Sequence, residues 1–400
     1  MTLDRFWLLP IAFGHVALFI YIVNVLHGLG QPERVMNRAK LVLLLGFSAA
    51  SVVLVSEAWR RVFLDWSWPT LLYGGVCILT GVVLFPAATI RLLNRPQPLG
   101  VRATQHVTNL ADATGAEELI GTGKHAWMLR LPGNESLRLR SVEWDLPIAG
   151  LPRALDGLSI LHISDLHLAP AFERRFFERV FEAASSHPCD LVLFTGDLVD
   201  SDEAIDWIAP LFSRLKGRLG SFAILGNHDL SHHPARLLEQ LKQSGFDALE
   251  GEWTTVDVNG KRVALGGTSS PWGPALRLDE RPEADVSILL SHSPDLFSWA
   301  ERAGFDLMVA GHNHGGQIRL PAVGPLFMPS RYSRRFDRGV FRRGKLTLHV
   351  SQGVAGKHPV RYGCIPEVSR LTLRASAIPK DARPRRALGH VRSDSGEVVR

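Results

Sequence analysis

Cysteine is scarce in this sequence, and its three cysteines, Cys77, Cys189 and Cys364, stand far apart. No C-x-x-C spacing occurs, so nothing indicates a disulfide framework or a zinc site built from thiolates. Cys77 lies inside an apolar stretch, where a buried thiol is ordinary. We therefore expect three free or buried thiols without a chemical role.

Acidic residues are almost missing from the first ninety or so positions, which are rich in Leu, Val, Ile and Phe. About 20 apolar residues suffice to cross the hydrocarbon core of a bilayer. Three stretches of residues 1–95 meet this requirement, at 6–29, 40–59 and 70–93. We predict three transmembrane helices, followed by a region of ordinary globular composition.

Polar side chains interrupt the first of these stretches at His15, Asn24 and His27. An intramembrane polar site is one interpretation, because ionisable groups within a membrane often have a function. Contacts between helices, or positions at the membrane interface, explain them equally simply. We favour the second interpretation.

Basic residues are not gathered into one tract, although the formal charge is +6. A nuclease would need a concentrated basic groove, so nucleic acid is not an expected partner. With three spans, the first loop and the globular region share one side of the membrane, and that side holds more Arg and Lys. This bias favours the cytoplasmic side for the globular region. Four arginines could receive phosphate or lipid headgroups, or form a solvated basic loop: Arg331, Arg334, Arg335 and Arg338.

The globular region has three parts. Residues 96–136 have few apolar runs and indicate a linker or loosely packed lead-in. From 137 to 375, apolar runs alternate with helical periodicity, as at Phe172–Phe181, Ala204–Leu215 and Ala235–Gln243, which predicts an α/β domain. Residues 376–400 are rich in charge, Pro, Ala and Ser, and we predict a disordered basic tail.

Five apolar runs of this domain each end in residues that can bind metals. Because functional residues in α/β sheets lie beyond the carboxyl ends of the strands, five strands of one sheet would bring them to a common mouth. A lone Asp after a strand is usually a turn or cap residue; five such endings in one domain favour a site. The runs end at Ser164-Asp165-Leu166-His167, Gly196-Asp197, Gly226-Asn227-His228-Asp229, Ser291-His292 and Gly311-His312-Asn313-His314.

Asp, His and Asn together form an oxygen and nitrogen ligand set that suits Mn, Fe or Zn rather than calcium. The set is large enough for two divalent ions if one carboxylate bridges them. Two metals about 3.5–4 Å apart are used for phosphoester displacement. The pattern therefore favours a dinuclear phosphoesterase centre.

The strings S-D-L-H-L, T-G-D-L-V-D, L-G-N-H-D and G-H-N-H-G-G-Q-I-R-L-P, in that order, resemble the calcineurin-like metallophosphoesterase superfamily, and in particular its membrane-associated bacterial branch. The resemblance extends over residues 137–373 and leaves the first ninety residues unexplained. It implies a two-sheet α/β/β/α sandwich and a location in a bacterial inner membrane.

The resemblance also implies roles for individual residues. One metal would be held by Asp165, His167, Asp197 and His314, and the other by Asp197, Asn227, His292 and His312, with Asp197 bridging. His228 would stabilise the phosphoryl group or protonate the leaving oxygen. Asp229 would orient His228, although a helix cap is an equally good interpretation of that residue.

These observations predict a membrane-anchored phosphoesterase that hydrolyses a phosphodiester or pyrophosphate through a metal-bridging hydroxide. A substrate held at the membrane, such as a phospholipid or nucleotide–lipid, suits the anchor. Two alternatives remain: a non-catalytic membrane sensor or scaffold that binds metal, and a phosphodiesterase acting on soluble nucleotides.

Overall fold

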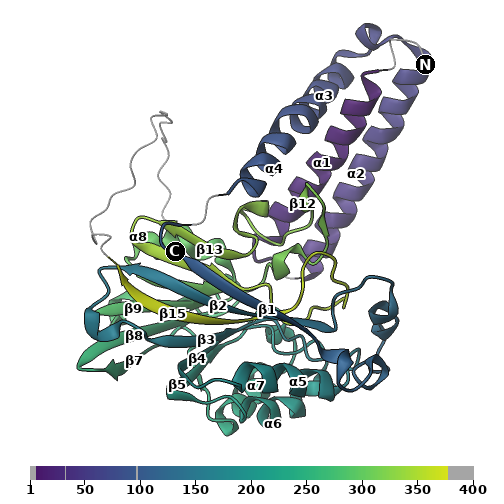
Figure 1. Cartoon of the computed structure of the whole chain (residues 1–400). Coiled ribbons are helices and arrows are strands. Elements are labelled where there is room, and N and C mark those ends of the chain that lie inside the picture. The colour runs from purple at the N-terminus through teal and green to yellow at the C-terminus, as the bar shows by residue number, and fades with distance from the viewer. Residues whose placement is uncertain (1–5, 32, 96–97, 377–400) are drawn as a thin grey trace.

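The computed structural model describes residues 6–31, 33–95 and 98–376, and it shows a helical bundle standing on a mixed α/β domain (Figure 1). The disordered tail that we predict at 376–400 lies, from residue 377 onward, outside the described residues.

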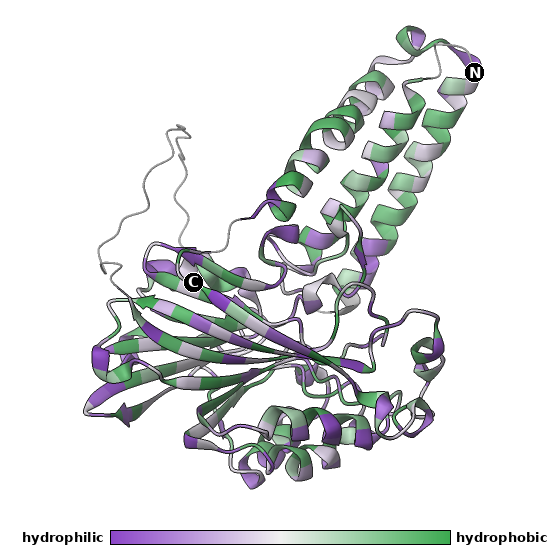
Figure 2. Cartoon of the chain, viewed as in Figure 1, coloured by the Kyte–Doolittle hydropathy of each residue, from purple (hydrophilic) through white to green (hydrophobic). Residues whose placement is uncertain are grey.

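The bundle contains α1 (Leu8–His27), α2 (Glu33–Arg60) and a third helix made of α3 (Trp68–Ile78), a π-helical turn (Leu79–Leu84) and α4 (Phe85–Leu93). Pro86, the second residue of α4, has no N–H and crowds the preceding turn, which explains the wider turn before it. By length and composition all three helices could cross a membrane, and their surface is largely apolar (Figure 2). The three predicted apolar helices are confirmed.

One end of the bundle packs on the domain. A Cβ at Gly28, just after α1, would lie 2.1 Å from the backbone nitrogen of Arg331, and one at Gly324 would lie 2.6 Å from the Leu92 side chain of α4. The turn between α1 and α2 therefore lies at the domain end, as expected for a chain with three spans.

Two sheets form the domain. The first has seven strands in the order β1 (Arg102–Asn109), β2 (Arg138–Ala149), β15 (Glu367–Ser376), β3 (Ser159–Ile163), β4 (Cys189–Thr195), β5 (Gly217–Ile224) and β6 (Asp247–Ala248). The second has six, in the order β13 (Gly339–Arg343), β14 (Leu346–Val350), β10 (Leu307–Ala310), β9 (Val286–Ser291), β8 (Lys261–Thr268) and β7 (Trp253–Val258). A separate short hairpin joins β11 (Arg319–Leu320) to β12 (Gly324–Pro325).

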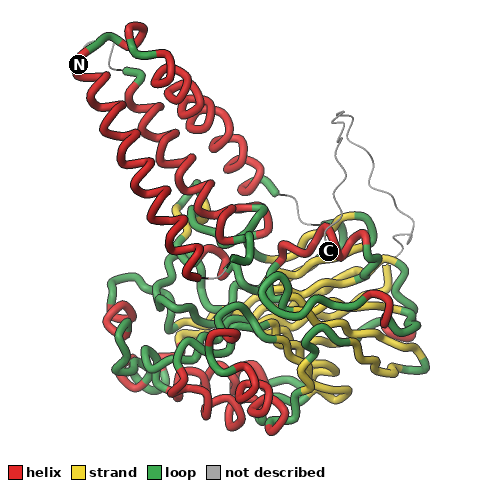
Figure 3. Tube along the Cα trace, turned by 180° about the vertical axis from the view of Figure 1, so that it is seen from behind, coloured by secondary structure: helices red, strands yellow, loops and turns green. Residues whose placement is uncertain are grey.

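The two sheets pack face to face and helices cover their outer faces. Apolar side chains of both sheets, among them Ile160, Leu191, Ile288 and Val309, form one buried cluster between them. Burying this apolar surface is the main force that holds the sheets together. Helices α5 (Arg174–Ser185), α6 (Ile208–Phe212) and α7 (Pro234–Gln243) cover the first sheet, and α8 (Phe297–Arg302) covers the second (Figure 3). This is the predicted α/β/β/α sandwich.

One expectation about the sheets is wrong. The five strands that carry the metal-binding residues do not belong to one sheet, because β3, β4 and β5 lie in the first sheet and β9 and β10 in the second. All five are buried, and buried strands give the same apolar runs in either sheet. Local sequence therefore does not separate the two sets.

Two further expectations need correction. The predicted helix Ala204–Leu215 is instead a 3-10 segment, Asp202–Trp207, followed by the five residues of α6. Pro210 explains the short helix, because proline is tolerated only in a first turn. The predicted linker 96–136 contains β1, which pairs with β2 along its whole length. Its residues are mostly exposed, so this edge strand has no alternating apolar pattern to reveal it.

Candidate metal centre

The predicted ligands meet where strands of both sheets end. Strands β3, β4 and β5 of the first sheet run parallel, and so do β9 and β10 of the second, so within each sheet their carboxyl ends lie at one edge. The residues after these ends approach one another across the sandwich: Asp165 and His167 after β3, Asp197 after β4, Asn227 and His228 after β5, His292 after β9, and His312 and His314 after β10.

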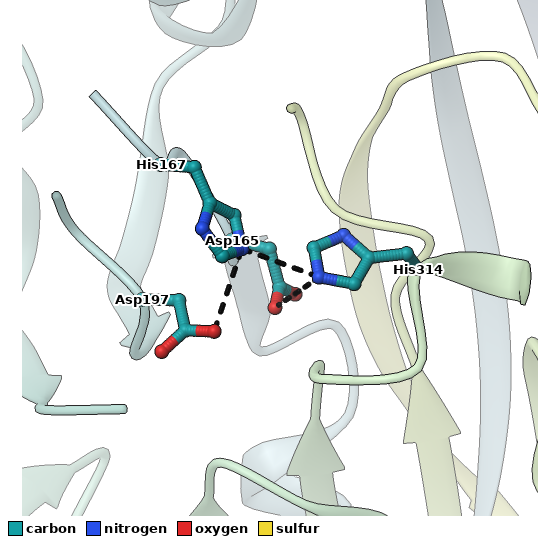
Figure 4. A group of neighbouring side chains, drawn as sticks. All are labelled: Asp165, His167, Asp197 and His314. Atoms are coloured by element: carbon teal, nitrogen blue, oxygen red, sulfur yellow. Dashed lines mark hydrogen bonds and ion pairs between the residues drawn. The ribbon is translucent and has the colours of Figure 1, made fainter. Parts of the chain in front are cut away.

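Asp165, His167, Asp197 and His314 form the first group of facing donor atoms (Figure 4). The His167 Nε2 atom lies 3.4 Å from Asp197 Oδ2 and 3.2 Å from His314 Nε2. The His314 Nε2 atom lies 3.6 Å from Asp165 Oδ1. These spacings leave room for one small cation between the four side chains.

A second group shares Asp197 with the first and contains His292 and His312. The His292 Nε2 atom lies 3.3 Å from Asp197 Oδ2, 3.1 Å from His312 Nδ1 and 3.1 Å from Asn227 Oδ1. The structure thus brings together all seven residues that the sequence predicts as ligands. Asp197 is the one that faces both groups.

Hydrogen bonds on the far side of three rings fix which nitrogen faces inward. His167 Nδ1 pairs with Asp200 Oδ2 at 2.9 Å, His292 Nδ1 with the Thr195 carbonyl at 2.7 Å, and His314 Nδ1 with the Ala355 carbonyl at 3.0 Å. A carbonyl or carboxylate can only accept, so each Nδ1 is the protonated nitrogen and donates. In the neutral rings the Nε2 atoms therefore present lone pairs inward, as metal-binding histidines do.

Five of the predicted ligands have a left-handed backbone conformation, which residues other than glycine rarely adopt. A left-handed residue costs roughly 1–2 kcal/mol, and such residues persist where the surroundings impose them, often at functional sites. Gly311 allows the loop to come close, because a Cβ there would lie 2.3 Å from Asp165 Oδ2. The φ angles are 55° at Asp165, 45° at His167, 58° at Asp197, 67° at His312 and 47° at His314.

Burial makes the charges of this cluster interdependent. Burial raises the pKa of the Asp165 carboxyl. Burial also opposes ionisation of Asp197, yet the neighbouring His292, His228 and His167 hold the pKa of that carboxyl well below its usual value. In turn, burial disfavours a charged His292 while Asp197 raises its pKa to about 9. The buried carboxylates therefore require compensating positive charge.

Divalent cations fit this requirement. Inward lone pairs of His167 and His314 face each other at 3.2 Å, an arrangement that is repulsive unless a proton or cation lies between them. The mixed oxygen and nitrogen set suits first-row metals. The two groups, joined at Asp197, match the arrangement of a dinuclear centre.

His228 lies at the partly exposed side of the cluster, where Asp200 engages its Nδ1 atom at 2.5 Å. The expectation that Asp229 orients His228 is therefore wrong. Asp229 is fully buried, and its carboxylate accepts hydrogen bonds from the backbone N–H groups of Leu198 and Gly226. It ties together the loops after β4 and β5, which carry Asp197 and Asn227.

Asp200 is one of two site residues that the sequence did not predict. Its two carboxylate oxygens contact His167 and His228, so one side chain positions both rings. A signal was present in T-G-D-L-V-D, where Asp200 follows Asp197 by three residues. Trp272 was missed as well; its ring centroid lies 4.9 Å from that of His312.

The four arginines predicted to meet phosphate or solvent divide into two pairs. Arg334 is buried and donates to the Thr89 hydroxyl of α4 at 2.7 Å, and Arg338 donates to Gln352 at 2.6 Å. Both serve structural contacts. Arg331 and Arg335 are exposed.

Comparisons with known proteins agree with this geometry. Residues 158–316 match the family model described as calcineurin-like phosphoesterase. The phosphodiesterase YaeI of Escherichia coli is 30% identical over 54% of this chain and 81% of its own length. The uncharacterised metallophosphoesterase YkuE of Bacillus subtilis is 26% identical over 68% of this chain and 97% of its own.

A third relative is the UDP-2,3-diacylglucosamine pyrophosphatase LpxG of Chlamydia muridarum, 25% identical over 58% of this chain and 88% of its own. The matched family region contains all of the predicted ligands, from Asp165 to His314. The chain belongs to the calcineurin-like metallophosphoesterase family, whose members are metal-dependent phosphoester hydrolases.

Proposed function

We propose that this protein is a membrane-anchored, dinuclear phosphoesterase that hydrolyses a phosphodiester or pyrophosphate in the headgroup of a lipid or nucleotide–lipid. The observation that carries the proposal is a loop, Pro271-Trp272, that contacts both the candidate metal centre and the domain end of the helical bundle. If the bundle crosses a bilayer, a phosphoesterase centre beside its end would meet substrates whose phosphate lies among the lipid headgroups.

Three contacts make this connection. A Cβ at Gly30, in the turn after α1, would lie 2.5 Å from the Pro271 ring. Trp272, the next residue, lies with its ring 4.9 Å from that of His312 and 5.9 Å from that of His292. One loop thus contacts both the turn that follows the first candidate span and the second ligand group.

Asp165, His167, Asp197 and His314 would hold one metal ion, and Asp197, Asn227, His292 and His312 the other. Bound Mn, Fe or Zn ions would supply Lewis acidity toward phosphate oxygens and lower the pKa of bound water. Asp197 faces both groups and would set their spacing. Asn227 contributes a neutral oxygen on the partly exposed side.

His228 would protonate the leaving oxygen. Asp200 engages its Nδ1 atom, so Nε2 is the nitrogen left to meet a substrate. General acids of this kind typically contribute about 10²–10⁴-fold. A sensor or scaffold that only binds metal would have no use for an oriented histidine beside the ligands.

We further propose that the domain lies on the cytoplasmic face of a bacterial inner membrane. The bundle end that contacts the domain carries Arg38, Lys40, Arg91 and Arg95 in its helices and flanks. Basic residues concentrate on the cytoplasmic side of membrane proteins. The name of the relative LpxG, a pyrophosphatase of a diacylated sugar nucleotide, supports a lipid-linked substrate.

The test is hydrolysis by detergent-purified, metal-stripped protein titrated with Mn. Aryl phosphodiester, aryl phosphomonoester, a lipid diphosphate and DNA would be compared. We expect metal-dependent cleavage of the lipid diphosphate and the aryl diester, and no cleavage of DNA. Bound metal without turnover of any compound would support the sensor, and preference for soluble nucleotides over lipid would overturn the lipid assignment.

A further inference from the structure

A segment after the last ligand joins the metal centre to the bundle. This docking segment, residues 318–336, begins four positions after His314 and contains β11 and β12. Its middle packs against the ligand loop, because a Cβ at Gly316 would lie 2.3 Å from Pro325 and 3.0 Å from Met328 Sδ. In Figure 1 β12 lies at the foot of the bundle, beside α1 and α4.

Two hydrogen bonds with Asn24 of α1 fix where this segment lies along the length of the first candidate span. Its buried side chain donates to the Leu326 carbonyl at 2.8 Å and accepts from the Met328 N–H at 2.9 Å. The span ends at His27, three residues later. At a rise of about 1.5 Å per residue, Asn24 lies nearly one helical turn inside the span end. Phe327, between the two bonded residues, lies at that same level.

Contacts with α4 likewise fix where the segment lies along the third candidate span. The buried guanidinium of Arg334 donates to the Thr89 hydroxyl and lies over the Phe85 ring, 4.6 Å from its centroid. The third candidate span ends only at Leu93. Two spans therefore hold the segment beside their last turns and not beyond their ends.

Apolar side chains of this segment face outward. Between residues 101 and 376, all of them described, five large apolar side chains are exposed, and three belong here: Ile318 at 47%, Leu320 at 43% and Phe327 at 54%. Exposed apolar side chains that recur within one short segment indicate an interaction surface. Arg331 and Arg335, also exposed, flank them with positive charge that suits anionic headgroups.

We propose that Ile318, Leu320 and Phe327 insert into the boundary between headgroups and acyl chains of the bilayer that the three helices cross. The occupant is lipid, because the spans themselves place Phe327 at membrane level. The docking segment would then be a further membrane contact, and it would hold the metal centre at a fixed height above the bilayer. The inference rests on membrane anchoring in the proposed function and does not require catalysis.

Lipid quenching of a labelled side chain tests this contact. Phe327→Cys and Leu320→Cys would each carry an environment-sensitive fluorophore in the full chain, reconstituted into vesicles of phosphatidylethanolamine and phosphatidylglycerol. The native thiols are buried, so labelling is selective. Leu278→Cys is the matched control, since Leu278 is 40% exposed and lies outside the docking segment, next to Arg277, whose carbonyl accepts a hydrogen bond from Trp253 of β7.

We expect bromine-labelled or spin-labelled lipid to quench the probes at 327 and 320 several-fold more than the probe at 278. Equal quenching at all three positions would overturn the proposal. Blue-shifted emission at 327 without lipid quenching would also overturn it, because a second copy or another protein would then cover the segment. Quenching does not depend on turnover, so an inactive enzyme leaves the measurement valid.

Discussion

The bundle and the phosphoesterase domain both contain buried or partly buried histidines, but the hydrogen-bond partners of their ring nitrogens differ. In the bundle, His15 Nδ1 pairs with the Tyr73 hydroxyl at 2.6 Å and Nε2 with the Ser51 hydroxyl at 3.0 Å. A hydroxyl can donate or accept, so both ring nitrogens are satisfied. In the domain, His292 Nδ1 donates to the Thr195 carbonyl, and its Nε2 atom faces the Asn227 Oδ1 atom, which is also an acceptor. The partner of the second nitrogen, and not burial, distinguishes a structural histidine from a candidate ligand.

The backbone shows the same contrast. Among the described residues 6–31 and 33–95, no residue other than glycine has a positive φ angle. In the domain five predicted ligands do. Helices across a membrane satisfy their own hydrogen bonds in regular geometry, whereas the loops of the metal centre hold unfavourable conformations. Ten described residues other than glycine have a positive φ angle, all of them in the domain, and five of the ten are predicted ligands, so strained backbone is concentrated at the metal centre.

The largest expected effect follows from Asp197→Asn. The amide removes a charge that both ligand groups share, and metal-ion catalysis is worth several kcal/mol, so we expect turnover to fall on the order of 10³-fold or more. Metal content, measured by mass spectrometry, should fall as well. Asp306→Asn is the control, because this buried carboxylate lies just before β10, at the opposite end of the strand from the ligands. Unchanged turnover in Asp197→Asn would contradict the shared role.

His228→Ala comes next. We expect turnover to fall by roughly 10²-fold or more while metal content stays near that of the wild type, because the residue meets substrate and not metal. Esters with a good leaving group should lose less, since they need less protonation. His232→Ala is the control, because His232 is partly exposed and pairs with Asp202 at 2.9 Å. Equal losses for good and poor leaving groups would argue against the acid role.

Asp200→Asn should have a smaller effect. Groups that orient metal ligands typically contribute about 10–100-fold to affinity or activity, and Asp200 contacts both His167 and His228. We expect a loss in that range, with a weaker apparent affinity for Mn in a titration of the metal-stripped protein. Asp202→Asn, an exposed carboxylate two residues later, should leave the titration unchanged. Loss of turnover without any change in Mn affinity would confine its role to His228.

The sequence predicted the site best where a metal-binding residue directly follows an apolar strand. The seven predicted ligands follow apolar strands directly, and buried strands end in recognisable ways, so each could be found from its own neighbourhood. The three apolar helices were equally clear, because length and composition alone decide them. The sandwich itself came from the family resemblance and not from periodicity.

What the sequence left open depends on partners that are distant in the chain. The division of the five strands between two sheets, and the bonds of Asn24 to Leu326 and Met328, join residues with no shared local signal. Asp200 holds the role that was expected of Asp229 for the same reason. Both are short acids near a ligand, and only the folded loops show which one reaches a ring.

The smallest effect is expected in the bundle, from His15→Phe. The change removes two hydrogen bonds, which within membranes average about 0.6 kcal/mol each, and it keeps a ring against Phe47, whose centroid lies 4.9 Å away. We expect a loss of about 1 kcal/mol in unfolding free energy in detergent, with metal content and turnover unchanged. Thermal unfolding measures the change in stability, and the Mn-dependent assay measures turnover. A tenfold loss of turnover would give His15 a functional role and remove the contrast between the two histidine clusters.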